Sequence, residues 1–190
     1  MIKKFDFEKK RTANFKALEP GGYVCKIHSA EVLNYDWGDV LKVNFDIAEG
    51  EFMDYYIEQY NRNPNEDRKW QGNIRITLPD EGNQYFESQK KKFGNFIVCV
   101  EESNPGYAWD WNEATLKDKY VGIVFGNEEY SFNGYSGWKA KPQLIVSTDD
   151  IYNNNFKVPK DKPLKNSSAS YAETPAGFEL VTDDDGVLPF

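Results

Sequence analysis

Residues 41–47 read Leu-Lys-Val-Asn-Phe-Asp-Ile, and this heptapeptide carries the clearest structural signal in the chain. Its apolar and polar side chains alternate without interruption, which predicts a strand with one buried and one exposed face. Residues 23–33 alternate less regularly, as expected of a strand that contains a β-bulge. Residues 34–39 have the composition of a turn and include Tyr35 and Trp37. The sequence therefore predicts an antiparallel hairpin with aromatic residues at its tip.

Three more strands are predicted at residues 52–60, 120–125 and 137–146, with a short extension of the sheet at residues 74–78. A tight turn at residues 49–51 precedes the third strand. Residues 126–136 contain Asn133 followed by Gly134, which favours a hairpin between the last two strands.

A helix is predicted between the third and fourth strands. Asp80 is its candidate N-cap, and apolar residues recur at helical spacing from Phe86 to Val100 before a stop at Ser103. Five strands with a helix at this point is the element order of the OB-fold. An SH3-like barrel or a β-sandwich would fit the strand count but not the helix. We therefore predict a mainly β protein with a five-stranded, OB-fold-like barrel in residues 1–165.

The net charge of −8 is distributed unevenly along the chain. All 23 Lys and Arg residues lie within residues 1–165, together with 26 of the 31 Asp and Glu residues. Residues 166–190 contain five acidic residues and no basic ones, and they read as a flexible linker followed by an acidic tail. A generally basic nucleic-acid binder is excluded. A local basic groove on the body would give modest, salt-sensitive phosphate affinity.

Catalysis, cofactors and membrane insertion find little support in the sequence. His28 is the single histidine, Cys25 and Cys99 lack a metal-ligand spacing, and no signal peptide or long apolar run precedes the body. We expect a soluble intracellular protein with reduced thiols, no cofactor and no enzymatic activity.

Aromatic residues are abundant, with 12 Tyr and 5 Trp, and they serve either a β-rich core or a base-stacking surface. OB barrels bind single strands across strands 2 and 3, flanked by the loops between strands 1 and 2 and between strands 4 and 5. Both loops are aromatic here. The candidate DNA-backbone contacts are Lys26, Lys42, Arg62, Lys69, Lys139 and Lys141, and the candidate base-stacking residues are Trp37, Tyr55, Tyr56, Trp70, Tyr130 and Tyr135.

The chain ends in residues 183–190, Asp-Asp-Asp-Gly-Val-Leu-Pro-Phe, which combine three carboxylates with a terminal aromatic ring. Such an end suits a partner with a basic surface and an apolar pocket. It resembles the acidic tip of bacterial single-stranded DNA-binding proteins, which finish Asp-Asp-Asp-Ile-Pro-Phe or Asp-Asp-Asp-Leu-Pro-Phe. Here Gly186 and Val187 are inserted. The resemblance implies that replication or recombination proteins bind Asp183, Asp184, Asp185, Leu188, Pro189 and Phe190.

The body is similar to a family of small phage-encoded proteins taken to bind single-stranded DNA. The similarity lies in residues 20–24, 45–50, 101–107, 124–130 and 156–160. It implies single-stranded DNA binding with little sequence preference, in phage or prophage replication or recombination, within the bacterial cytoplasm. Two other classes remain open: a protein-interaction module or nucleic-acid mimic that does not bind DNA, and a carbohydrate- or peptide-binding β domain.

Overall fold

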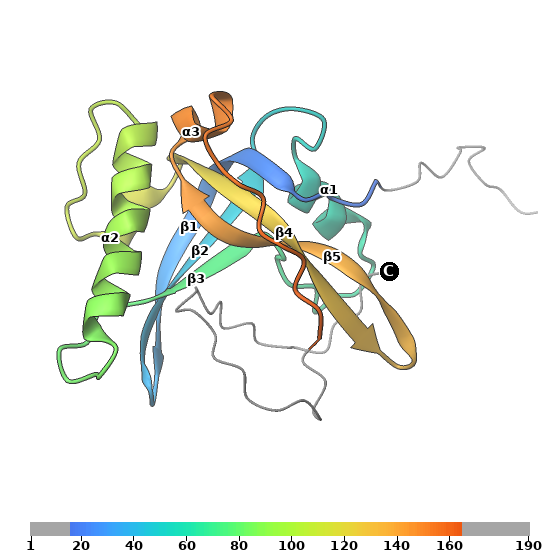
Figure 1. Cartoon of the computed structure of the whole chain (residues 1–190), viewed down its shortest axis with the longest axis horizontal. Helices are drawn as coiled ribbons and strands as arrows, with labels where there is room; N and C mark the ends of the chain where they lie inside the picture. Colours follow the sequence, from blue (N-terminus) through green and yellow to red (C-terminus); the bar gives the residue numbers. More distant parts are fainter. Residues whose placement is uncertain (1–15, 165–190) are drawn as a thin grey trace, which may run out of the picture.

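The computed structural model describes residues 16–164, which are built around a five-stranded antiparallel sheet in the order β3-β2-β1-β4-β5 (Figure 1). The strands are β1 (Gly21–Tyr35), β2 (Gly38–Ile47), β3 (Asn73–Thr77), β4 (Tyr120–Phe132) and β5 (Tyr135–Val146). The helices are α1 (Tyr55–Arg62), α2 (Phe86–Ser103) and α3 (Thr148–Tyr152), with a 3-10 turn η1 (Glu113–Leu116). The predicted mainly β class and strand number are confirmed.

The first hairpin is confirmed in detail. Tyr35 pairs with Gly38 across a two-residue turn, and the register shifts between Ile27 and Ser29, where the sequence predicted a bulge. In β2 the apolar side chains of residues 41–47 all lie in the core, while Lys42 points from the opposite face. Because a bulge bends the strand that contains it, β1 curves across the top of the molecule toward its lower left corner (Figure 1).

Residues 52–60 were predicted to form the third strand, and this prediction is wrong. They form a turn that leads into helix α1 (Tyr55–Arg62), and Phe52 of the turn and Tyr56 of the helix are both buried. A strand would have placed Asp54 on the same face as these two rings, whereas a helix turns it away. The third strand is instead β3, where the sequence indicated only a short extension of the sheet.

A buried carboxylate fixes the start of α1. Asp46 is 3% exposed and accepts hydrogen bonds from the backbone N–H groups of Ile47, Tyr56 and Ile57, each at 2.8 Å. Its negative charge therefore lies at the helix N-terminus, where the backbone dipole favours an anion. Burial raises the pKa of Asp46, and the three backbone donors counteract that rise.

Helix α2 starts at Phe86 with Tyr85 as its N-cap, five residues later than predicted. Asp80 is not its cap, because the Asp80 carboxylate accepts from the Gly82 N–H at 2.9 Å in a local turn. Phe93, Phe96 and Val100 of α2 pack into the core formed by the sheet.

The same helix contacts both edge strands of the sheet, β3 and β5. The Asn95 side-chain amide donates to the Ile145 carbonyl at 3.2 Å, so α2 satisfies a group on the open edge of β5. Within residues 16–164 the sheet ends at β3 and β5 without pairing them, and it is open rather than a closed barrel.

The second hairpin is longer than the sequence indicated. β4 and β5 run to a two-residue turn at Asn133 and Gly134, whose φ values of 46° and 83° fit a type I′ turn. The residues predicted as its tip mostly extend the two strands. Both hairpin tips lie toward the lower part of the view, on opposite sides of it (Figure 1).

The last described segment covers the outer face of β1 and β4. A Cβ atom on Gly22 would lie 2.5 Å from the Phe156 ring, and one on Gly122 would lie 2.5 Å from the Ser147 carbonyl. Farther along, Lys162 pairs with β4. The Lys162 N–H donates to the Asn127 carbonyl, and the Glu129 N–H donates to the Lys162 carbonyl, both at 2.9 Å. Residues 153–164 therefore protect an edge of β4 that β1 leaves unpaired.

None of the helices described within residues 16–164 is long and apolar enough to span a membrane. The predicted N-terminal arm lies mostly, and the linker and tail of residues 166–190 wholly, outside the described residues.

Replacement of Asp46 by Ala should lower the free energy of unfolding by roughly 2–4 kcal/mol, because three backbone N–H groups lose their acceptor. Asp46→Asn keeps one acceptor oxygen and should cost less. Urea unfolding followed by circular dichroism measures both changes, with Asp36→Ala at the exposed β1–β2 turn as the control. An Asp46→Ala protein as stable as this control would show that the carboxylate does not anchor α1.

Candidate nucleic-acid interface

The tip of the β1–β2 hairpin presents a stacked aromatic pair. The rings of Tyr35 and Trp37 lie 5.1 Å apart with an interplanar angle of 9°, and Trp37 is 50% exposed. Trp37 therefore does not fold back over the core. Tyr35 was not among the predicted contacts, although its place in the same turn could have identified it.

The β4–β5 hairpin presents three more exposed aromatic residues. Tyr135 is 77% exposed beside the turn, and the ring of Tyr130 lies over Gly137, where an added Cβ would meet it at 3.0–3.2 Å. Trp138, which sequence reasoning missed, is 49% exposed. It projects from the sheet face that also carries the core residue Ala140 two positions later. The alternation of Trp138 and Ala140 with Lys139 and Lys141 was the available signal.

Two predicted stacking residues belong to the body of the protein instead. Tyr56 is 6% exposed and contacts Phe45 edge to face at 5.6 Å, and its burial raises its pKa well above the ordinary value. Tyr55 is half-buried, and its hydroxyl accepts from the Leu18 N–H at 3.3 Å. We therefore assign Tyr56 to the core. Both placements follow from residues 52–60 forming a helical segment rather than a strand.

Trp70 is held against β2 by its own indole N–H, which donates to the carbonyls of Phe45 and Gly72 at 3.0 Å each. Its ring contacts His28 edge to face at 5.4 Å. Arg68 lies over the Tyr60 ring at 4.6 Å beside it. Trp70 thus fixes the 63–72 loop, while the neighbouring Lys69 is exposed.

Four of the six predicted basic contacts form ion pairs in the structure. The pairs are Lys26 with Asp118 at 2.8 Å, Lys42 with Glu31 at 3.0 Å, Arg62 with Glu58 at 3.3 Å and Lys141 with Glu128 at 3.5 Å. Exposed or half-exposed pairs of this kind contribute little to stability. A phosphate could therefore replace these carboxylates at low cost, although the acids reduce the local positive potential.

Lysines gather on the outer face of the β4–β5 hairpin. Glu128 pairs with both Lys141 and Lys162 at 3.5 Å and lies directly opposite Lys139 in the ladder. Lys139 has no ion-pair partner within residues 16–164, and burial, followed by the charge of Lys141, lowers its pKa. Lys162 was missed because it arrives from a segment distant in sequence. Three lysines around one carboxylate leave this face positive.

Arg75 lies directly opposite Lys42 on the polar face of β2 and β3, because Ile74 and Ile76 on either side of it point into the core. The sequence contained this signal in the alternation of residues 74–78. Lys42 and Arg75 therefore place two cations side by side on the polar face of the sheet, near its β3 edge.

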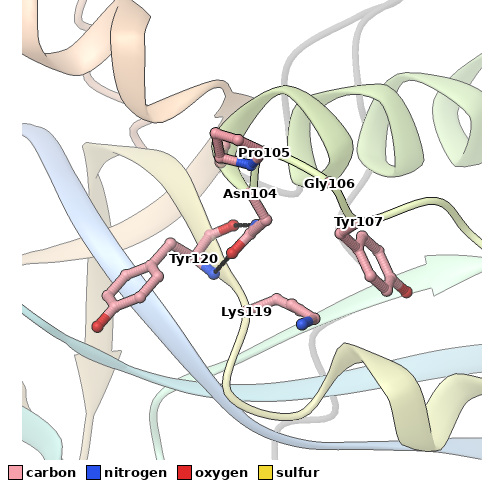
Figure 2. Close-up of a pocket in the computed structure, with 7 residues that line it drawn as sticks. Asn104, Pro105, Gly106, Tyr107, Lys119 and Tyr120 are labelled. Atoms are coloured by element: carbon pink, nitrogen blue, oxygen red, sulfur yellow. Dashed lines mark hydrogen bonds between the residues drawn. The ribbon is translucent and has the colours of Figure 1, made fainter.

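A pocket of about 420 Å³ lies between the end of α2 and the start of β4 (Figure 2). The Asn104 side chain closes its upper side by donating to the Tyr120 carbonyl at 2.8 Å and accepting from the Tyr120 N–H at 2.9 Å. Lys119 lies 4.8 Å from the Tyr107 ring centroid, and Tyr107 and Tyr120 stand on opposite sides of it. None of the predicted contacts lines this pocket.

The six predicted tail contacts, Asp183, Asp184, Asp185, Leu188, Pro189 and Phe190, lie outside the described residues. Residues 16–164 contain no group of three or more His, Cys, Asp or Glu side chains placed to hold a metal ion. In comparisons with known proteins, no family model and no curated protein matches the chain.

The two tyrosines predicted to stack bases should differ sharply in their contribution to stability. Tyr56→Ala removes a buried ring and should cost about 3–5 kcal/mol of unfolding free energy, as large-to-small core changes do. Tyr135→Ala changes an exposed ring and should stay within about 0.5 kcal/mol of the parent protein. Chemical denaturation of the two variants tests this, and equal stabilities would contradict the core assignment of Tyr56.

Lys139→Met should leave the protein as stable as the parent or make it more stable, because a half-buried charge is removed. In the parent, the unfolded state keeps the Lys139 proton to higher pH than the folded state does. The unfolding free energy contributed by this group therefore rises as pH passes through the lowered pKa toward the ordinary value of 10.5. In Lys139→Met, the unfolding free energy should not show this rise with pH.

Urea unfolding over an alkaline pH series measures this difference, with Lys91→Met on the exposed side of α2 as the matched control. The idea fails if Lys139→Met and the parent show the same pH dependence.

Proposed function

We propose that this protein binds single-stranded DNA with little sequence preference and recruits partner proteins through its acidic C-terminal tip. The observation that carries the proposal is the combination of two aromatic hairpins, β1–β2 and β4–β5, with an antiparallel sheet that has a helix between its third and fourth strands. This is the element order of an OB-fold, which is described as a partly open barrel. An open sheet edged by α2 is compatible with that description.

In this proposal bases stack on the exposed rings at the two hairpins. Trp37, Tyr130, Tyr135 and Trp138 are available, and each stacked base would contribute about 1–3 kcal/mol. Every base offers a π-face, so stacking of this kind discriminates weakly between sequences. Trp70, whose indole N–H is bonded to β2 and to the 63–72 loop, would form one border of the DNA site.

The phosphates would be held by cations between these rings. Lys42 and Arg75 supply charge on the β2–β3 face, and Lys139, Lys141 and Lys162 supply it on the β4–β5 hairpin. Binding would exchange carboxylate partners for phosphates. Because the protein as a whole is acidic, affinity should be modest and should fall steeply with salt.

The tail would have the separate task of binding protein partners. Its carboxylates repel phosphate, and its Leu188-Pro189-Phe190 end resembles the tips by which single-stranded DNA-binding proteins recruit replication or recombination proteins. The site of action would be the cytoplasm of a bacterial host, in phage or prophage DNA metabolism.

The net charge of −8 favours one alternative, a protein-interaction module or nucleic-acid mimic that does not bind DNA. Such a protein would use the same exposed rings against an apolar protein surface. It predicts no binding to oligonucleotides even at low salt.

Fluorescence anisotropy of labelled oligo-dT and of a matched duplex separates these functions. The full chain and a chain that ends at Thr182 should both prefer the single strand, and the shorter chain should bind equally well or more tightly because its acidic end is gone. Trp37→Ala together with Tyr135→Ala should weaken binding by at least about tenfold if each ring stacks a base. Absence of binding by both chains at low salt would reject the proposal in favour of the interaction module.

A further inference from the structure

Trp111 is the most exposed of the large apolar residues in the described part of the chain, with 80% of its surface accessible. Its backbone has φ 65°, a left-handed conformation that is unfavourable for a bulky side chain. Such a conformation persists only where surrounding contacts enforce it, and it is concentrated at functional positions. The DNA-binding proposal gives this residue no role.

The loop that carries Trp111 is firmly held. The Asp110 carboxylate accepts from the Asn112 N–H at 3.2 Å and from the Thr115 hydroxyl at 3.0 Å. Asn112 caps η1 by accepting from the Ala114 N–H at 3.1 Å. The exposed indole is therefore presented by an ordered loop, which lowers the entropic cost of binding with it.

One side of the Trp111 ring is supported from beneath. It stacks on Phe93 of α2 with centroids 6.3 Å apart and an interplanar angle of 29°, and Trp109 packs beside both rings. The Trp109 indole nitrogen is buried without a hydrogen-bond partner. The opposite side of Trp111 is open.

The charge around this ring disfavours DNA and favours a basic partner. Residues 101–118 contain five acidic residues and one lysine. Glu113 lies two positions from Trp111 and is partly exposed. A partner surface that matches would combine an apolar recess with a positive charge.

This same molecule carries such a surface next to the loop. The pocket in Figure 2 has Pro105, Tyr107 and Tyr120 as walls and Lys119 as its charge. Tyr107 also joins the pocket to the Trp111 loop, because its hydroxyl shares a 2.9 Å hydrogen bond with Thr115. The projecting ring and the recess therefore lie on one continuous surface.

We propose that this surface is a self-association site, in which Trp111 of one copy enters the 104–107 and 119–120 pocket of a second copy and the second copy does the same in return. A patch that contains both a projection and its complementary recess closes on itself by two-fold symmetry and ends at a dimer. Glu113 of each copy would lie against Lys119 of the other. Both aromatic hairpins lie elsewhere in the chain, so the dimer does not require the DNA-binding proposal.

Sedimentation equilibrium of the full chain tests the proposal. The parent should show a concentration-dependent monomer–dimer equilibrium, and Trp111→Ala should weaken dimerisation by at least about tenfold, as loss of a central aromatic anchor does. Trp111→Gly suits the positive φ value and guards against misfolding as an explanation. Trp37→Ala removes an exposed indole at the β1–β2 tip and should leave dimerisation unchanged.

A charge exchange tests the predicted contact between Glu113 and Lys119. Glu113→Lys alone and Lys119→Glu alone should each be monomeric, since both place like charges together at the two-fold interface. Mixed in equal amounts, the two variants should recover a heterodimer.

A parent chain that stays monomeric up to its solubility limit would overturn the dimer. So would a dimer that is indifferent to Trp111, or a mixture that remains monomeric. Loss of oligo-dT binding by Trp111→Ala without any effect on assembly would assign the ring to DNA instead.

Discussion

The staggered pairing of β1 is the constraint on which the rest of the fold depends. Its first residues, from Gly21 to Lys26, pair with β4, and its later residues pair with β2. Only Cys25 and Lys26 pair with both neighbours. For most of its length, β1 therefore has β2 or β4 beside it, but not both. The bulge after Ile27 bends the strand between these two ladders. As a result, the tips of the two hairpins lie on opposite sides of the lower part of the view (Figure 1).

An overhanging hairpin has no core beneath its tip, and this explains where the exposed aromatic residues are found. Tyr35 and Trp37 lie at the tip of the β1–β2 hairpin. The outer part of the β4–β5 hairpin, beyond the residues that pair with β1, carries Tyr130, Tyr135 and Trp138. The core itself is complete without them, because α2 fills the open side of the sheet with Phe93, Phe96 and Val100. Rings that fold stability does not require are free to serve binding.

The charge distribution separates the surfaces of the protein by task. Lysines gather where residues 153–164 bring Lys162 to the β4–β5 hairpin, whereas acids gather in residues 101–118 around Trp111, which stacks on α2. An acidic protein can bind a polyanion only if its cations are concentrated in one place and its surplus acids are kept elsewhere. The same acids provide a surface suited to protein contacts, so the proposed DNA site and the proposed dimer surface do not compete.

The sequence by itself determined the regular strands and turns, since these depend on neighbouring residues. Alternation in residues 41–47 defined β2, the irregularity near Ile27 marked the bulge, and Asn133 with Gly134 specified the tight turn of the second hairpin. The same patterns placed Trp37 in a hairpin turn and Tyr135 close to one.

Only the tertiary structure decided those features that depend on contacts between residues far apart in the sequence. Residues 52–60 have a pattern open to strand or helix, and Asp46 on another element fixes the helix by accepting its first backbone N–H groups. Burial of Tyr56 follows from that choice. Closure of the barrel was likewise undecided in one dimension, because it depends on which element lies along the open edge of β5. The helix occupies that edge, and Lys162 reaches Glu128 only once the chain has folded back across β4.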